Sequence, residues 1–188
     1  MSKINVKDLC YMALYVALAV VLDYVSALIP FLQMPNGGSI NLAVIPVFVA
    51  SYHLGAKKGV AVGLLWWLVG FMRGFNNWYL NPMQYLLDYI IPVGVIGFAC
   101  LLPKIGSINN VFTGVVVISI IRFVATVLSG VYYWPPEEAV AGSSAAWAYS
   151  LGYNFWYNFA TMIVACILVQ LIVNRLQKTK VKFIGFKG

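Results

Sequence analysis

Three charged side chains occur inside long apolar stretches of the sequence, and their chemistry needs an explanation. They are Asp23, Asp88 and Arg122. A charged group within a membrane is costly and normally faces a helix-bundle interior or a cavity. Asp88 and Arg122 could neutralise each other in a salt bridge, or the Asp88 carboxylate could hold a cationic ligand. Asp23 is expected near the outer end of its helix, in a structural role, where it can accept hydrogen bonds from the neighbouring loop.

Polar and aromatic side chains accompany these charges. At about 1.5 Å of helix rise per residue, Tyr149 and Asn154 are expected at a depth comparable to that of Asp88 and Arg122. Aromatic faces favour flat or cationic ligands by about 0.5 to 2 kcal/mol per good contact. The sequence therefore predicts a pocket for an aromatic, positively charged small molecule, surrounded by Tyr85, Tyr89, Trp147, Tyr149, Tyr153, Trp156 and Tyr157.

A second interpretation of the aromatic residues is open. Trp and Tyr concentrate where a membrane meets water, at the level of the lipid headgroups. Several aromatic residues near the expected helix ends fit such a belt as well as they fit a pocket: Trp78, Tyr79, Tyr132, Tyr133, Trp134 and Trp147.

The composition identifies the elements that must position these residues. Of 188 residues, 62% are apolar and 9% are charged, too few polar groups to cover a water-soluble globule. A transmembrane helix needs about 20 apolar residues. We therefore expect one all-α membrane domain over residues 1–188, retained from its first span onward, with spans near 8–29, 40–55, 58–73, 82–102, 108–132 and 148–175.

The basic residues predict the orientation of these six helices. With both termini in the cytoplasm, only Arg73 falls in an outer loop and Arg122 within a span. Fusing the second and third spans would divide the remaining basic residues between the two sides, against the positive-inside rule. We predict a six-helix bundle in the cell membrane with these residues on the cytoplasmic side: Lys3, Lys7, Lys57, Lys58, Lys104, Arg175, Lys178, Lys180, Lys182 and Lys187.

Motifs for catalysis are missing from the sequence. It has no Walker motif, nucleophile elbow, HExxH or glycine-rich phosphate loop. Its single histidine, His53, has no nearby metal-ligand partners, and its three cysteines fall in or beside apolar stretches. We expect no enzyme activity, no metal and no cofactor.

A partner surface is expected on the first span, where Ala13 and Ala17 are four residues apart. Small residues at this spacing allow another helix to approach closely. A rival hypothesis needs no partner: an ion-coupled carrier working alone, with Asp88 and Arg122 as a proton relay.

With these residues in view, the chain resembles the thiamine-specific S component, or substrate-binding subunit, of energy-coupling factor (ECF) vitamin transporters. The resemblance extends over nearly the whole length. It rests on four segments, namely residues 34–46, residues 86–89, residues 122–130 and residues 147–154.

The resemblance implies roles for individual residues. It implies that the carboxylate of Asp88 engages the positive charge of thiamine, that Tyr89 lines the pocket, and that Tyr149 and Asn154 contact the pyrimidine. It also implies that Trp134 belongs to the pocket. Tyr85, Arg122, Thr126 and Trp147 complete the expected substrate site.

The resemblance also implies partners and a mechanism. The alanine face of the first span would dock on a transmembrane coupling subunit attached to two ATPases, which use the ATP. The loop Asn36-Gly37-Gly38 would act as a mobile lid, because glycine gives a loop conformational freedom.

One position departs from the family pattern. Many members have a histidine four residues after the basic residue of the fifth span, where this chain has Thr126. Threonine can still form hydrogen bonds but lacks the ring and the titratable group. An S component for another vitamin or precursor is therefore the closest alternative.

Overall fold

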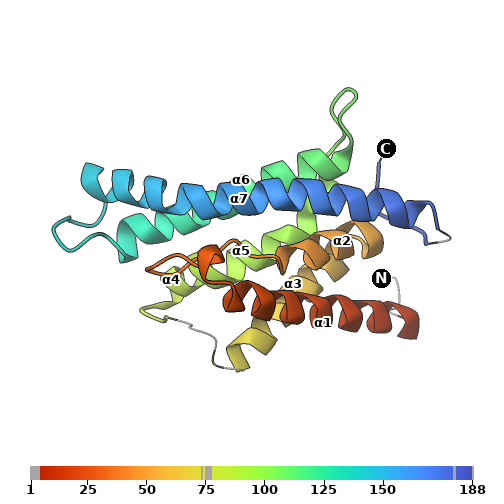
Figure 1. Ribbon diagram of the computed structural model, residues 1–188, viewed down its shortest axis with the longest axis horizontal. Helices are drawn as coiled ribbons and strands as arrows, with labels where there is room; N and C mark the ends of the chain where they lie inside the picture. The colour runs from red at the N-terminus through yellow and green to blue at the C-terminus, as the bar shows by residue number, and fades with distance from the viewer. Residues whose placement is uncertain (1–4, 73, 75–77, 180, 188) are drawn as a thin grey trace.

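The computed structural model describes residues 5–72, 74, 78–179 and 181–187, and the named elements of this part of the chain are all helices (Figure 1). Lys3, Arg73 and Lys180, which contribute to the orientation argument, lie outside the described residues. Each predicted span corresponds to a helical stretch: α1 (Val6–Leu28), α2 (Val44–Leu54), α3 (Ala56–Met72), an irregular stretch over Pro82–Leu101, α6 (Asn110–Tyr133) and α7 (Ser144–Gln177).

The predicted spans and the observed helices differ mainly at their ends. α7 begins at Ser144 rather than at 148, because the side chain of Ser143 accepts a hydrogen bond from the amide of Ala146 and caps the helix. Gly55, with φ of +86°, ends α2. Gly59 lies inside α3.

The fourth stretch is not a regular helix. It consists of α4 (Pro82–Tyr85), a π-helical turn η2 (Leu86–Ile90), α5 (Ile91–Gly94) and the 3-10 helix η3 (Val95–Leu101). Pro92 has no amide hydrogen to donate to the carbonyl of Asp88, four residues earlier. The amide of Ile91 bonds instead to the carbonyl of Leu86, five residues back. Asp88 therefore lies on a π turn, a feature frequent at functional sites.

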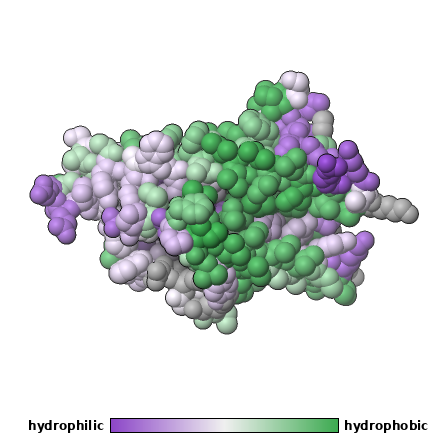
Figure 2. Space-filling model, in the orientation of Figure 1, coloured by the Kyte–Doolittle hydropathy of each residue, from purple (hydrophilic) through white to green (hydrophobic). Residues whose placement is uncertain are grey.

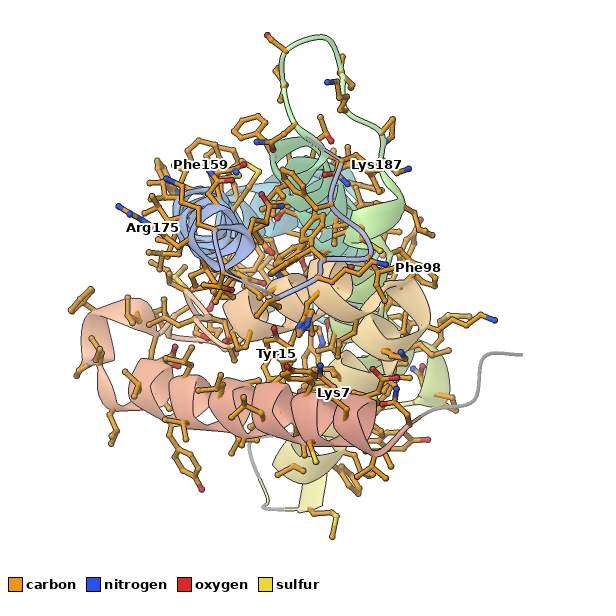
Figure 3. The ribbon with its side chains drawn as sticks, turned by 90° about the vertical axis from the view of Figure 1, so that its right-hand side faces the viewer. Lys7, Tyr15, Phe98, Phe159, Arg175 and Lys187 are labelled. Carbon is orange, nitrogen blue, oxygen red and sulfur yellow. The ribbon has the colours of Figure 1, made fainter. Side chains whose placement is uncertain are left out.

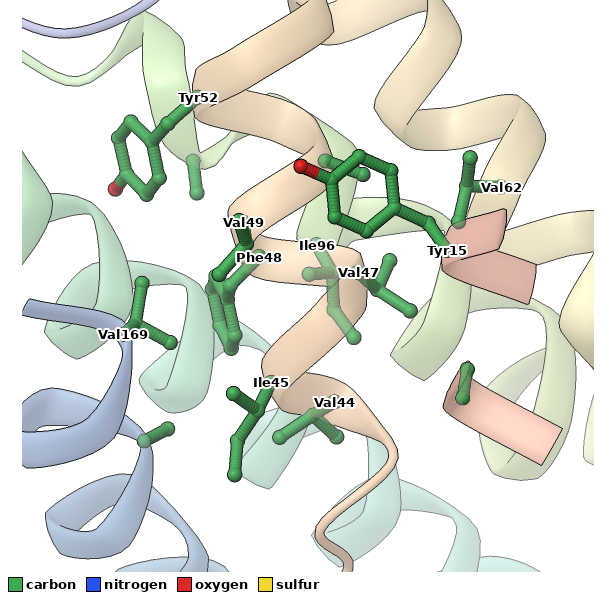
Figure 4. Close-up of a cluster of buried hydrophobic side chains, with 14 of the residues drawn as sticks. Tyr15, Val44, Ile45, Val47, Phe48, Val49, Tyr52, Val62, Ile96 and Val169 are labelled. Carbon is green, nitrogen blue, oxygen red and sulfur yellow. The ribbon is translucent and has the colours of Figure 1, made fainter. Parts of the chain in front are cut away.

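Counting only residues that the structure describes, four of the stretches are long and apolar enough to cross a membrane: α1, Pro82–Leu101, α6 and α7. α2 has only 11 residues, and every one of them is buried. It therefore forms the centre of the core, where Phe48 packs among Val49, Ile96 and Val169 (Figure 4). α1, α3, η3 and α7 surround it.

Close packing in this centre depends on glycine. A Cβ on Gly97 of η3 would lie 2.6 Å from the backbone of Gly59 in α3, and a Cβ on Gly63 would lie 2.5 Å from the carbonyl oxygen of Val93. Small residues let helix backbones approach in this way. Gly59 and Gly63 thus form a small-xxx-small contact inside the chain, which we did not predict.

The surface matches a protein surrounded by lipid. In Figure 2 apolar residues cover the middle of the visible face, and hydrophilic residues gather toward its ends. α1 begins and α7 ends at the same end of the bundle (Figure 1). That end carries Lys7, Arg175 and Lys187 (Figure 3), and the ion pair between Lys58 Nζ and Asp8 Oδ2 at 2.8 Å.

The C-terminal segment folds back onto the end of α2. The amide of Ile184 donates to the carbonyl of His53, and that of Gly185 donates to the carbonyl of Tyr52. His53 is buried, and its Nδ1 lies 2.9 Å from the hydroxyl of Tyr15. The described residues contain no group of three side chains able to hold a metal ion.

Candidate functional site

A cavity of about 1140 Å³ lies between the first loop, the ends of α1 and α3, the π turn, α6 and the first half of α7. Ligand pockets commonly measure about 300 to 1,000 Å³. This cavity is therefore large enough for a small organic molecule and some water. Its lining joins segments from residue 23 to residue 158, so only the tertiary structure assembles it.

The carboxylate of Asp88 is held in this cavity by two donors. Gln84 Nε2 donates to Asp88 Oδ2 at 2.7 Å, and Trp134 Nε1 donates to the same oxygen at 3.0 Å. Gln84 is fully buried and is itself fixed by the amide of Leu80 and the carbonyl of Trp78. Both donors use Oδ2, so Oδ1 has no hydrogen-bond partner among the described residues. One face of a fixed carboxylate is thus available to a cationic ligand.

Asp88 and Arg122 do not form the salt bridge that we considered. Both line the cavity, but within the described part of the chain the one salt bridge joins Lys58 and Asp8. The Asp88 carboxylate is turned toward Gln84 and Trp134 instead. The two charges therefore face the cavity separately.

α7 contributes a row of tyrosines at four-residue spacing. Tyr149, Tyr153 and Tyr157 share one face of the helix, and the rings of Tyr149 and Tyr153 stack with centroids 5.8 Å apart. Asn154 and Asn158 lie beside them and line the same cavity. Both amides donate to main-chain oxygens one turn earlier, so their orientations are fixed by α7 itself.

The first loop closes over these tyrosines. The hydroxyl of Tyr153 accepts from the amide of Asn36 and donates to the carbonyl of Gly37, both at 2.8 Å. Asn36 Nδ2 also donates to the hydroxyl of Tyr149 at 3.2 Å. Gly38, with φ of +88°, passes so close to Tyr157 that a Cβ would lie 2.8 Å from the ring. The segment that we expect to act as a lid is therefore bonded to α7.

Thr126 takes part in the same network. Its hydroxyl donates to the carbonyl of Phe123 at 3.0 Å and accepts from Asn158 Nδ2 at 3.3 Å. The position at which many family members carry histidine thus faces the cavity and bonds to α7.

Most of the expected substrate residues line the cavity. They are Asp88, Tyr89, Arg122, Thr126, Trp134, Tyr149 and Asn154. Tyr85 lies outside the lining, and its ring packs against that of Tyr89 at a centroid distance of 4.7 Å. Trp147 is also outside it and packs against the buried cluster of Val127, Val131 and Ala146. Trp156, expected nearby, is 68% exposed on the outer surface.

Several lining residues were not expected at the substrate site. Asp23 accepts from Asn41 Nδ2 at 3.0 Å, as predicted for a loop contact, but it also lines the cavity. Trp66, Trp67 and Asn158 line it too. The four-residue spacing from Asn154 could have identified Asn158. Nothing in the sequence indicated which face of α3 would present its two tryptophans.

A second surface of interest lies on α1, away from the cavity. Ala13 and Ala17 are both exposed on the outside of the bundle, whereas Ala19 is fully buried. The small-residue spacing therefore faces outward and is open to another helix.

Comparison with known proteins gives matches over most of the chain. The sequence model of a family described as thiamine transporter protein (Thia_YuaJ) matches residues 9–181. The thiamine transporter ThiT of Bacillus subtilis (strain 168) is 34% identical over 171 residues, which cover 85% of this chain and 86% of that protein.

Two solved structures share the fold. ThiT from Listeria monocytogenes superimposes with a TM-score of 0.63 at 21% identity, covering 92% of this chain and 94% of that one. The S component of a bacterial ECF transporter superimposes with a TM-score of 0.64 at 19% identity, covering 92% and 96%.

Proposed function

The chain belongs to the family of thiamine transporter proteins, and from this premise we propose that it binds thiamine with high affinity as the S component of an ECF-type transporter. It is a multi-pass protein of the cell membrane and a transporter rather than an enzyme. The likeness of its fold to that of an ECF S component supports the assignment of subunit type.

The observation that carries the proposal is the fixed carboxylate of Asp88 in an aromatic cavity. Thiamine carries a permanent positive charge on an aromatic ring, and both properties match this lining. Gln84 and Trp134 hold Oδ2 in place, which leaves Oδ1 for the cationic ring. Because the carboxylate is already oriented, little conformational freedom is lost when the ligand binds.

The remaining polar residues would orient the rest of the ligand. Tyr149 and Asn154 line the cavity on α7, where the pyrimidine ring would lie, and Tyr89 and Trp134 supply aromatic surface. Thr126 replaces the family histidine with a smaller hydroxyl that is already bonded to Asn158. This replacement is the observation that favours the alternative ligand, a vitamin or precursor related to thiamine.

Transport requires the cavity to open on one side and later on the other. We place the basic end of the bundle, with both termini, in the cytoplasm, following the positive-inside rule. The first loop then closes the outer side of the cavity. Opening it requires breaking the bonds that fasten Asn36 and Gly37 to Tyr153.

Reorientation would be driven by a partner. The exposed Ala13 and Ala17 on α1 would dock on a transmembrane coupling subunit, and two attached ATPases would hydrolyse ATP. A proton relay between Asp88 and Arg122, as in a solitary carrier, is disfavoured because these residues do not contact each other.

The test is a thiamine titration of the full chain, purified in detergent from thiamine-starved cells and followed by tryptophan fluorescence. Trp66, Trp67 and Trp134 line the cavity, so a bound ligand should change their emission. Saturable quenching at or below micromolar thiamine is the expected result. If the tryptophan emission of the folded protein is quenched by another vitamin or precursor and not by thiamine, that compound is the ligand in place of thiamine.

A further inference from the structure

The loop over residues 102–109, between η3 and α6, projects sideways from the bundle. In Figure 1 it leaves the bundle near the end at which α1 begins and α7 ends. The end-on view of Figure 3 shows the same loop pointing away from the helices. Because the helices cross the membrane along the long axis of the bundle, a loop with this direction runs parallel to the membrane plane.

The length of α6 places this loop at the level of the lipid headgroups. α6 has 24 residues and is therefore about 36 Å long. The hydrocarbon core of a bilayer is about 30 Å thick. Both ends of α6 consequently reach the headgroup region, and the 102–109 loop enters α6 directly at Asn110. The loop therefore extends from the bundle into the interface between lipid and water.

The 102–109 loop has a fixed shape. Ile105 and Ile108 form an antiparallel bridge in which each amide donates to the carbonyl of the other, at 3.0 and 2.9 Å. Gly106, with φ of +57°, allows the tight turn between them. At the base of the loop, Thr113 Oγ1 donates to the carbonyl of Pro103 at 2.6 Å. The first turn of α6 thus sets the direction of the loop.

The loop exposes apolar side chains. Residues paired across an antiparallel bridge present their side chains on the same face, and Ile105 and Ile108 are 61% and 46% exposed. Leu101 at the end of η3 and Phe112 in the first turn of α6 are exposed as well. The apolar surface of the loop therefore continues onto two helices that face lipid. Transfer of such side chains out of water is favourable.

The same end of the bundle has a surplus of positive charge. Lys104 precedes Ile105, and the amide of Lys187 donates to Asn110 Oδ1 at 2.8 Å, so two exposed lysines flank the start of α6. Of the five acidic residues in the sequence, Asp8 alone lies at this end, where it pairs with Lys58. The net charge around the loop is therefore complementary to anionic lipid headgroups.

We propose that the 102–109 loop is an interfacial anchor for anionic lipid. Ile105 and Ile108 insert among the lipids of the leaflet at the basic end, as the apolar face of an interfacial helix does. Lys104 and Lys187 extend their charged ends to the lipid phosphates. The anchor sets the depth of α6 in the membrane. It does not depend on which ligand the cavity binds, so failure of the proposed function would leave it standing.

The first experiment measures the depth of the loop with a spin label on Ile105→Cys, in the full chain carrying Cys10→Ala and Cys166→Ala. The chain is reconstituted in vesicles of equal parts phosphatidylcholine and phosphatidylglycerol. The measured quantity is the ratio of collision rates with oxygen, which dissolves in lipid, and with a neutral nickel chelate, which stays in water.

Two labelled positions provide the references for depth. Ile163→Cys lies on the exposed surface of α7, in the middle of the helix, and Val140→Cys lies in the exposed loop after α6. We expect the ratio at Ile105 to be closer to that at Ile163 than to that at Val140. A ratio equal to that at Val140 would overturn the anchor and leave the apolar face of the loop to a protein partner.

The second experiment tests the charges and needs no cysteine variant. Native mass spectrometry of the detergent-purified chain gives the dissociation constant of phosphatidylglycerol. It should rise by roughly fivefold for each lysine lost in Lys104→Gln/Lys187→Gln. Lys57→Gln/Lys178→Gln is the matched control, with two exposed lysines outside the loop at the same end. Equal rises in the two double variants would overturn specific binding of anionic lipid at the loop.

A further measurement covers a labelled chain that fails to fold. Ile105→Trp in vesicles of brominated phosphatidylcholine and phosphatidylglycerol should show more quenching of total tryptophan emission than the wild type, because bromine quenches only tryptophan that it contacts. Added emission that the brominated lipid does not quench would contradict insertion of the loop.

Discussion

At the scale of single residues, the site depends on how the protein uses the two oxygens of one carboxylate. Gln84 and Trp134 both donate to Asp88 Oδ2, which fixes the group without using Oδ1. Each donor comes from a different part of the chain, one turn before Asp88 and at the end of α6. The carboxylate is therefore set by one local and one tertiary contact, and is oriented for a cation before any ligand arrives.

Replacing Asp88 by Asn tests this assignment. The amide removes the negative charge and presents donors to the cationic ring, so thiamine affinity should fall by about 10- to 100-fold, as for a lost charged hydrogen bond. Glu137→Gln is the matched control, because Glu137 lines the same cavity from an exposed loop. Fluorescence titration of both variants gives the comparison, and equal effects would contradict a specific role for Asp88.

At the scale of elements, two features position the site: the fastened first loop and the π turn. The loop crosses the open side of the cavity and bonds to α7, 113 to 117 residues further along the chain. The π turn carries Asp88 and follows from the position of Pro92. Neither element contributes much surface to the core, and both control access to the ligand or its orientation.

The loop prediction concerns ligand release. Tyr153→Phe removes the hydroxyl that bonds to both Asn36 and Gly37, so the lid should open more often. Two bonds of about 1 kcal/mol each would raise the dissociation rate of thiamine roughly 10- to 30-fold, with a smaller change in the association rate. Stopped-flow fluorescence measures both rates.

Tyr149→Phe serves as the control for the lid. Tyr149 receives a single bond from Asn36 at 3.2 Å, so its loss should raise the dissociation rate less than the loss of Tyr153 does. A dissociation rate unchanged in Tyr153→Phe would show that these bonds do not hold the lid.

The prediction for the π turn concerns Pro92. Pro92→Ala restores an amide hydrogen and allows a regular α-helix, which would rotate Asp88 away from Trp134. We expect thiamine affinity to fall at least about tenfold while the melting temperature stays the same or rises. Pro82→Ala is the control, since Pro82 occupies the first turn of α4, where a missing amide hydrogen has no cost. Unchanged thiamine affinity in Pro92→Ala would show that the π turn is not required for thiamine binding.

At the scale of the whole molecule, stability depends on backbones that approach closely around the buried α2. Gly59, Gly63 and Gly97 allow α3 and the fourth stretch to pack with almost no side chain between them. Apolar area cannot drive such association in lipid, so close packing has to contribute. The bundle should therefore be sensitive to a single methyl group at these positions.

Gly97→Ala should destabilise the fold by about 1 to 3 kcal/mol, because its Cβ would overlap the backbone of Gly59 and Val60. Gly152→Ala is the matched control, since a Cβ on Gly152 meets nothing within 4 Å. Alanine is the better helix former by about 1 kcal/mol, so this variant should be neutral or stabilised. Melting curves of the two variants in the same detergent measure the difference in stability, and equal melting temperatures would contradict the packing argument.

Assembly belongs to the same scale. Ala17→Trp places a bulky ring on the exposed alanine face of α1, and we expect it to abolish co-purification with the coupling subunit while thiamine binding is retained. Leu171→Trp provides a control on the exposed surface of α7. If both Ala17→Trp and Ala13→Trp assemble normally with the coupling subunit, the docking surface is not the alanine face of α1.

The solvent, the number of helices and the identity of the charged residues could be predicted from the sequence. The apolar content of a segment and the placement of basic residues can be read from neighbouring positions along the chain. Predictions that rest on them therefore do not depend on how distant segments pack. The six expected spans accordingly match six helical stretches. Asp88, Trp134, Tyr149 and Asn154 were expected at the pocket and do line the cavity.

Only the tertiary structure decided which of these residues meet. The Asp88–Arg122 pair did not form, Tyr85 and Trp147 lie outside the lining, and Gln84, Trp66 and Asn158 lie at the site. Each outcome depends on the rotation of a helix about its axis and on one local π turn. That rotation is set by glycine contacts and hydrogen bonds between distant segments, which no local pattern of apolar residues records.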